Sequence, residues 1–98
     1  MFTEEKYVVY ILANKRNGTL YTGLTAQLPE RLEQHRSNQV PGFTRKYNVK
    51  RLVHFERYND LTEARLRERR VKRWPRKWKI DLIEKSNPDW NDLSKDVL

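Results

Sequence analysis

The sequence predicts a single α+β domain of 98 residues, and three observations support this prediction. Residues 7–14 and 51–58 are runs of β-branched and aromatic side chains, which favour strands. Asn17-Gly18 follows the first run, and this dipeptide is a strong signal for a tight turn between antiparallel strands. Pro29 and Pro75 stand where helices are expected to begin, after the hairpin and near the end of the chain.

The predicted hairpin pairs the first run with a return strand at residues 19–25. If only the Asn-Gly pair forms the loop, as a type I′ turn, the strands pair in this register: Leu12–Gly23, Tyr10–Thr25 and Asn14–Tyr21. Side chains directly opposite each other share a sheet face, so Tyr10 and Tyr21 lie together, and Gly23 leaves a gap between them. The opposite face is expected to belong to the core, because its side chains are hydrocarbon: Val9, Ile11, Leu20 and Leu24.

The first helix is expected from Pro29 to about Asn38, because proline fits the first helical turn. Arg31 and His35 are four residues apart and therefore share one face of this helix. Residues 40–50 are predicted to form a loop, which a Pro-Gly pair opens.

A second helix is predicted to follow the strand at residues 51–58, with Asp60 or Thr62 as its cap and its end near Arg73. A third helix is expected at residues 76–85, where an Asn-Pro pair stops it. Residues 89–93 are expected to add one last turn.

The chain is strongly basic, with a formal net charge of +8 and a sequence pI near 10.0. The positive charge is concentrated in residues 65–79, where nine of fifteen residues are Lys or Arg and only Glu68 is acidic. Apolar residues interrupt this block, so it is expected to fold and to present its charge on one face. Such a surface indicates an anionic partner. Charge alone leaves nucleic acid, the ribosome and a membrane surface open as that partner.

Cysteine is absent, which excludes disulfide bonds and thiolate metal sites. The N-terminal region has no basic leader before its short apolar run, and no apolar stretch approaches membrane-spanning length. We therefore expect a cytoplasmic protein without a membrane partner.

Glu68 stands among the apolar positions of its predicted helix, close to Ala64 and Val71 on the helical wheel. Two interpretations are open. The first is local pairing with Arg65 or Lys72, which contributes roughly 0.2–0.5 kcal/mol in an exposed helix. The second is a carboxylate directed inward as a ligand for Mg²⁺, an ion that prefers oxygen ligands and keeps most of its waters.

Tyr10, Tyr21, Arg31 and His35 have ordinary explanations when each is taken singly, as strand aromatics and as an exposed helix face. An Arg is nevertheless the preferred ligand for phosphate oxygens, and a His exchanges a proton near neutral pH. A phenol becomes a useful proton acceptor where cations or a metal lower its pKa. The excess of positive charge predicts such a lowering here.

The order of these residues resembles the signature of the GIY-YIG nuclease superfamily. The two motifs stand as Val8-Val9-Tyr10 and Tyr21-Thr22-Gly23, and the Arg, His and Glu discussed above follow on two helices. Residues 63–93 look like the stand-alone bacterial branch of this superfamily, which is similar to the N-terminal domain of an excision-repair nuclease. The resemblance covers residues 7–93. It implies one domain with a central three-stranded antiparallel sheet flanked by helices.

The chain departs from the family pattern at two motif positions. Val8 stands where the first motif has Gly, and Thr22 stands where the second has Ile. The family also tends to place an Asn downstream of the Glu. Ile80 stands twelve residues past Glu68, which leaves Asn87 as the nearest candidate.

The resemblance implies an endonuclease that hydrolyses phosphodiester bonds in nucleic acid, with DNA as the expected substrate, in DNA repair or related processing. Tyr10 would accept a proton from the attacking water or position that water, and Tyr21 would support the water or the phosphate. Arg31 would neutralise charge on the phosphoryl oxygens, and His35 would assist proton transfer. Glu68 would anchor one Mg²⁺ or Mn²⁺, which stabilises the leaving oxygen.

Flanking phosphates are expected to contact the basic surface without sequence readout. The residues expected to make these contacts are Arg45, Lys46, Arg65, Arg69, Arg70, Lys72, Arg73 and Arg76.

Two other functions are compatible with the sequence. One is a catalytically silent nucleic-acid-binding module of the same fold, in which Trp74, Trp78 and Tyr47 stack on unpaired bases. The other is a protein that needs a protein partner for targeting.

Overall fold

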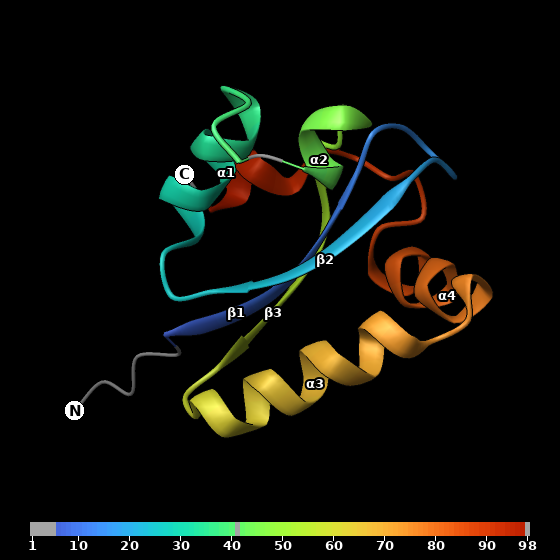
Figure 1. Cartoon of the computed structure of the whole chain (residues 1–98). Coiled ribbons are helices and arrows are strands. Elements are labelled where there is room, and N and C mark those ends of the chain that lie inside the picture. Colours follow the sequence, from blue (N-terminus) through green and yellow to red (C-terminus); the bar gives the residue numbers. More distant parts are fainter. Residues whose placement is uncertain (1–5, 41, 98) are drawn as a thin grey trace.

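The hydrophobic runs form a three-stranded antiparallel sheet in the order β2-β1-β3 (Figure 1). The computed structural model describes residues 6–40 and 42–97. The strands are β1 (Tyr7–Ala13), β2 (Leu20–Thr25) and β3 (Arg51–Tyr58). The predicted α+β class is therefore confirmed, and β1 is the central strand, whose residues Val8 to Ala13 are all buried.

The predicted hairpin register is wrong by two residues. Tyr10 lies opposite Gly23 and Leu12 lies opposite Tyr21, because the loop comprises residues 14–19 and not two residues alone. The side chain of Asn14 accepts a hydrogen bond from the Thr19 amide at 2.9 Å and holds this wider loop. The φ of Asn17 is 56°, in the left-handed region, whereas the φ of Gly18 is not in that region. A type I′ turn needs both, so it does not form.

A slip of two positions keeps every side chain on its predicted face, because the side-chain period of a strand is two. Tyr10 and Tyr21 accordingly share one face of the sheet, with ring centroids 6.3 Å apart. Gly23 lies directly under the Tyr10 phenol, since a Cβ built on it would lie 2.5 Å from the Tyr10 hydroxyl oxygen. The gap predicted at this glycine exists, and the ring of Tyr10 fills it.

In residues 6–40 and 42–97, four helices and one short 3₁₀ segment surround the sheet. They are α1 (Leu28–Arg36), α2 (Phe43–Lys46), α3 (Leu61–Arg73), α4 (Arg76–Ser86) and η1 (Leu93–Asp96). Asp60 caps α3 as predicted by accepting a hydrogen bond from the Thr62 amide at 3.0 Å. The prediction of a loop at residues 40–50 is wrong for residues 43–46, which form α2. The last turn is η1, which begins at Leu93, the end of the predicted range 89–93, and Asp92 caps it by accepting from the Ser94 amide.

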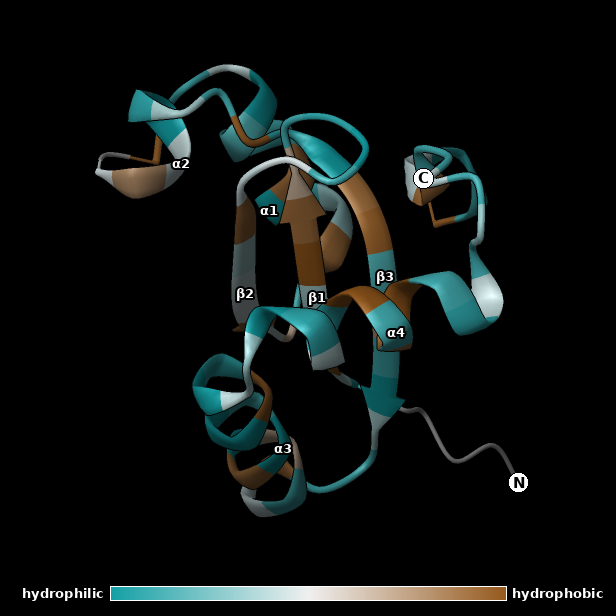
Figure 2. Ribbon diagram, turned by 90° about the vertical axis from the view of Figure 1, so that its right-hand side faces the viewer, coloured by the Kyte–Doolittle hydropathy of each residue, from teal (hydrophilic) through white to brown (hydrophobic). Residues whose placement is uncertain are grey.

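The helices form two layers, with α1, α2 and η1 on one face of the sheet and α3 and α4 on the other (Figure 1). Each face has its own hydrophobic core. The core under α3 and α4 contains Ile11 and packs against Leu20, as predicted, whereas Leu24 is half-buried. The tyrosine face is also a core, since Val8 and Leu12 pack there against α1. Figure 2 shows β1 as hydrophobic along most of its length.

Within the part of the chain that the structure describes, no helix combines the length and the apolar character needed to cross a membrane.

Candidate active site

Tyr10 and His35 meet beneath the first layer of helices. Tyr10 comes from the central strand and His35 from the last turn of α1, and both are buried. The Tyr10 hydroxyl oxygen lies 3.3 Å from His35 Nε2. The two residues therefore form a hydrogen-bonded pair in which a proton can pass between a phenol and an imidazole.

The other nitrogen of the imidazole contacts α2. His35 Nδ1 lies 3.2 Å from the Thr44 hydroxyl oxygen, and Thr44 is itself buried. Burial lowers the pKa of His35 below 6.5, and the charge of Arg31 lowers it further. The imidazole is therefore neutral at pH 7, with one nitrogen free to accept a proton.

Burial also changes the acidity of Tyr10, in the direction opposite to the sequence-based expectation. Its pKa is raised well above 10, first because the ring is buried and then because Tyr21 lies close by. Arg31 acts in the expected lowering direction, but its effect is smaller than that of burial. The prediction that cations lower this pKa is wrong, and Tyr10 is a neutral phenol at pH 7.

Tyr21 and Arg31 complete the surroundings of the pair. The Tyr21 ring lies 5.6 Å from the imidazole of His35, centroid to centroid. Arg31 is half-buried one turn before His35, and its charge acts on both Tyr10 and His35. Arg31 forms no ion pair with any residue in 6–40 or 42–97. Its positive charge is thus available to an anion beside the two phenols.

Glu68 approaches the same cluster from the other layer of helices. Its side chain is 15% exposed, and its negative charge contributes to the raised pKa of Tyr10. Its carboxylate also pairs with Lys72 Nζ at 2.6 Å, one helical turn along α3. Both interpretations of this residue therefore have a structural basis: it is directed inward, and it is locally paired.

The side chains here suit a metal site that substrate and water would complete, and not one that is enclosed by protein ligands. Within residues 6–40 and 42–97, no group of three or more His, Asp or Glu side chains is placed to hold an ion. Mg²⁺ does not require such a group, because it commonly binds one or two carboxylates together with water and substrate phosphates. Glu68 would be the protein ligand of such an ion, and the other ligands would come from the substrate and from water.

All eight residues expected to contact flanking phosphates are exposed. Two of them already have partners, since Lys72 pairs with Glu68 and Arg76 donates to the carbonyl oxygens of Asn17 and Gly18. Arg67 belongs to the same basic block but turns inward, where it binds Glu56. The block therefore exposes most of its charge while one member has a structural role.

Asn87, the nearest candidate for the family's downstream Asn, has a structural role. Its side chain is buried and donates to the carbonyl oxygens of Val53 and Asn91, at 3.1 and 2.9 Å. Its own oxygen accepts from the Asn91 amide at 3.0 Å. The side chain thus joins the end of α4 to β3, and its hydrogen bonds are all structural.

Sequence reasoning missed Thr44, which holds the imidazole, and Phe43, which stacks on Tyr21 with ring centroids 6.4 Å apart. Both belong to α2, which was expected to be loop. The local sequence signal near them is the Pro-Gly pair that precedes them. Such a pair indicates a turn of the chain, but it does not indicate which side chain a neighbouring residue will contact.

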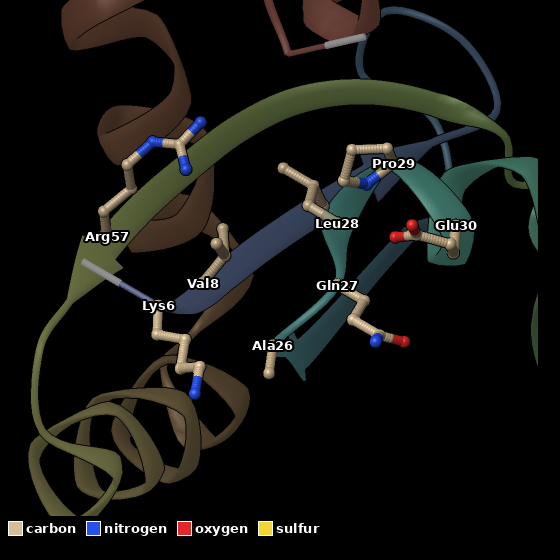
Figure 3. A pocket seen from close by; sticks show the side chains of 8 residues that line it. All are labelled: Lys6, Val8, Ala26, Gln27, Leu28, Pro29, Glu30 and Arg57. Carbon is tan, nitrogen blue, oxygen red and sulfur yellow. The ribbon is translucent and has the colours of Figure 1, made fainter. Parts of the chain in front are cut away.

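A cavity of about 590 Å³ adjoins the start of α1 (Figure 3). Val8 and Leu28 give it an apolar wall, and Lys6, Arg57 and Glu30 carry charges around it. None of the five candidate catalytic residues lines this cavity. The candidate chemistry therefore lies outside it, around the Tyr10–His35 pair.

Comparison with known proteins gives the family. The family model described as the GIY-YIG catalytic domain matches residues 6–81. The UPF0213 protein OB0043 of Oceanobacillus iheyensis is 35% identical over 81 residues, which are 83% of this chain and 93% of that protein. A UPF0213 protein of Syntrophus aciditrophicus is 36% identical over 85 residues, which are 86% of this chain and 95% of that protein.

A solved structure agrees with these relatives. The solution NMR structure of the UPF0213 protein BH0048 from Bacillus halodurans superimposes with a TM-score of 0.56 at 29% identity. The match covers 91% of this chain and 94% of that chain. The motifs, the sheet that carries them and these matches lead to one conclusion: the chain belongs to the GIY-YIG catalytic domain family.

Proposed function

We propose that this chain is a metal-dependent endonuclease that hydrolyses phosphodiester bonds in DNA, in repair or related processing. One observation supports this more than any other. A neutral phenol, Tyr10, lies in hydrogen-bond contact with a neutral imidazole, His35, beside an Arg31 that no described carboxylate neutralises. This arrangement can take a proton from water and bind a phosphate at the same place.

The proton would move through Tyr10 to His35. A phenol with a raised pKa cannot act as a phenolate at pH 7, so it must lose one proton as it takes another. The attacking water gives its proton to the Tyr10 oxygen while the Tyr10 proton passes to His35 Nε2. This step requires the tautomer in which His35 Nδ1 donates to the Thr44 hydroxyl oxygen, 3.2 Å away, and Nε2 is unprotonated.

The phosphate would lie against Arg31. Its guanidinium donates two parallel hydrogen bonds to the phosphoryl oxygens, which gain charge as water attacks. Tyr21 lies beside Tyr10 and supports the water or the phosphate.

Glu68 would hold the metal ion, Mg²⁺ or Mn²⁺, with water and the phosphate as the remaining ligands. The bound ion supplies charge stabilisation for the leaving oxygen. The exposed basic residues of α2 and α3 would bind flanking phosphates without reading the base sequence.

The substitution Glu68→Gln tests this proposal, because it keeps the side chain's shape and removes the charge that holds the ion. We expect nicking of a labelled DNA to require Mg²⁺ in the wild-type protein and to be abolished in the variant. The melting curve should change little, since Gln keeps the shape of the side chain and an i,i+4 helix pair contributes only about 0.2–0.5 kcal/mol. DNA binding should persist or tighten, because a basic surface has lost one negative charge.

Glu56→Gln is the matched control, because it removes a second inward carboxylate that lies in a different cluster. Metal-dependent nicking that survives Glu68→Gln would contradict the assignment of the metal ligand.

A silent nucleic-acid-binding module is the second candidate, and the Glu68–Lys72 pair at 2.6 Å favours it. In that case the carboxylate already has its partner. Wild-type protein would then bind DNA equally well with and without Mg²⁺ and would produce no nicks.

A further inference from the structure

Four aromatic rings form a continuous series that leads out of the candidate active site. The ring centroids of Tyr10 and Tyr21 are 6.3 Å apart, and those of Tyr21 and Phe43 are 6.4 Å apart with planes inclined by 28°. The Phe43 and Tyr47 rings follow at 4.9 Å. The series thus begins in the central strand of the sheet and ends on α2, which lies beside α1 in both views (Figures 1 and 2).

The inner and outer halves of this series differ in exposure. Tyr10 is 2% exposed, whereas Phe43 and Tyr47 are 45% and 43% exposed. Single exposed apolar side chains are ordinary in soluble proteins. Two exposed rings in contact with each other, and with a third ring of the active site, form a patch of the kind that marks a binding surface.

Positive charge surrounds the two exposed rings. Arg45 and Lys46 lie between them in the sequence and are exposed, and Lys46 Nζ lies 5.4 Å from the centroid of the Tyr47 ring. A cavity of about 280 Å³ is lined by Phe43 together with Arg76 and Lys79. Of the described residues that line this cavity, none is acidic. The surface therefore combines ring faces with cations, which suits a polyanion that carries flat bases.

We propose that Phe43 and Tyr47 form a stacking surface for unpaired bases, so that the substrate is a nucleic acid with a single-stranded segment next to the bond that is cut. Stacking on aromatic rings accepts every base, because each has a π-face, but it requires that the base be unpaired. In a duplex, neighbouring base pairs cover these faces, and only phosphates and base edges reach a protein surface. The inference rests on the proposed function in one respect, the placement of the cut bond at Tyr10.

Trp78 offers a matched control. It is also exposed, at 55%, and it packs edge-on against Trp74. It lies on α4, on the opposite face of the sheet from Tyr10, and Asp81 lines the hollow beside it.

The experiment measures binding of a short single-stranded DNA and of its duplex at fixed salt, with EDTA present so that no cleavage occurs. The proteins are the wild type, Phe43→Leu, Tyr47→Leu and Trp78→Leu, and a melting curve shows that each is folded. Leucine keeps an apolar side chain on the surface and removes the ring. A 2-aminopurine base in the single strand reports stacking through the quenching of its fluorescence.

We expect Phe43→Leu and Tyr47→Leu each to weaken single-strand binding by about tenfold and to reduce the quenching, with duplex binding unchanged. Trp78→Leu should change neither. Equal losses for single strand and duplex, or the same loss with Trp78→Leu, would overturn the inference.

The outcomes separate this inference from the proposed function. A protein that nicks no DNA but loses single-strand binding in Phe43→Leu would contradict the nuclease and support the stacking surface. In the opposite case, Mg²⁺-dependent nicking would be equally fast on gapped and on fully paired DNA, for both the wild type and Phe43→Leu. That result would support the proposed nuclease and overturn the stacking surface.

Discussion

Two clusters in this protein contain the same four residue types, Tyr, His, Arg and Glu, and differ in how the charged groups are paired. The first, here called the Glu56 cluster, consists of His54, Glu56, Tyr58 and Arg67. The second is the candidate active site, with Tyr10, Arg31, His35 and Glu68. Comparing them shows what separates a structural polar cluster from a reactive one.

In the Glu56 cluster every partner binds the same carboxylate. Arg67 donates two hydrogen bonds to Glu56, at 2.8 and 2.9 Å, and His54 and Tyr58 contact it at 2.8 and 2.7 Å. Burial alone raises the pKa of Glu56, but these hydrogen bonds outweigh burial and hold the pKa well below its usual range. Burial and the bond to Glu56 raise the pKa of Tyr58 to about 12. The charges of this cluster are matched internally.

In the candidate site the charges are not matched internally. Glu68 pairs with Lys72 and not with Arg31, and the hydrogen bond of the site joins two neutral groups, Tyr10 and His35. The Arg31 charge therefore lacks a carboxylate partner among the residues that the structure describes. Residue types alone therefore do not identify a site. What matters is whether one charged side chain has no partner within the protein and can bind a ligand.

The largest expected effect is that of Tyr10→Phe on cleavage. The change removes the oxygen that takes the proton from water, and proton transfer of this kind contributes about 10²–10⁴-fold to the rate. We expect cleavage to fall at least about 100-fold, while stability falls by about 1–3 kcal/mol because the buried His35 Nε2 loses its partner. The measurement is single-turnover nicking together with urea unfolding.

Tyr58→Phe is the matched control for this prediction, because it removes the same hydroxyl from the Glu56 cluster. It should lower stability and leave cleavage unchanged. Equal rates for Tyr10→Phe and wild type would mean that the two clusters do not differ in function.

The next effect is that of Glu56→Gln on stability. Removing one partner of a fully buried ion pair costs about 3–5 kcal/mol. Glu56 and Arg67 are 19% and 27% exposed, so we expect a smaller loss, about 2 kcal/mol. Urea denaturation should show it as a lower midpoint at constant slope. Cleavage per folded molecule should equal that of the wild type, and a large loss of cleavage would contradict the separation of the two clusters.

Arg31→Lys is expected to reduce cleavage by about tenfold, which corresponds to about 1.4 kcal/mol of transition-state stabilisation. Lysine keeps the charge but cannot donate two parallel hydrogen bonds to a phosphate. Arg67→Lys, the equivalent change in the Glu56 cluster, should reduce stability and spare cleavage. If both variants cleave at the wild-type rate, Arg31 is only a surface charge.

The smallest effect expected is a separation of two acid responses. The pKa of His35 lies below 6.5, so its acceptor nitrogen is free above pH 6.5 and is lost as the pH falls through the lowered value. The pKa of Glu56 is lowered from 4.5, so its stabilising contribution is complete above pH 4.5 and is lost as the pH falls further. We therefore expect cleavage to decline as the pH falls below 6.5, through the lowered pKa of His35, and the stabilisation by Glu56 to decline only below pH 4.5. Coincident losses would argue against His35 as the proton acceptor.

The sequence predicted those features of the site that depend on local periodicity. Tyr10 and Tyr21 share a face because strand parity fixes it, even though the predicted register was wrong by two residues. Arg31 and His35 share a helix face because they are four residues apart.

Features that depend on packing between distant segments could not be predicted in this way. Thr44 reaches His35 only because α2 packs beside α1, and Glu56 binds Arg67 only because α3 lies over the sheet. The raised pKa of Tyr10 follows from burial under α1, which no local pattern encodes. The predicted direction was wrong because burial of the phenol raises its pKa by more than the positive charge of Arg31 lowers it.

The central position of β1 has a consequence for how the chain folds. Ala13 pairs with Leu20 across the hairpin and with Arg51 across the other edge, at sequence separations of 7 and 38 residues. Closing the longer loop costs about 1.5 kcal/mol more chain entropy, because the cost grows with the logarithm of loop length. The hairpin therefore loses less chain entropy when it forms and is expected to form first. Docking of β3 is expected to be slower, because its contacts with β1 join residues far apart in the sequence. Both tyrosines lie on the hairpin, whereas α3, which carries Glu68, follows β3 along the chain. We therefore expect the phenols to assemble before the carboxylate arrives.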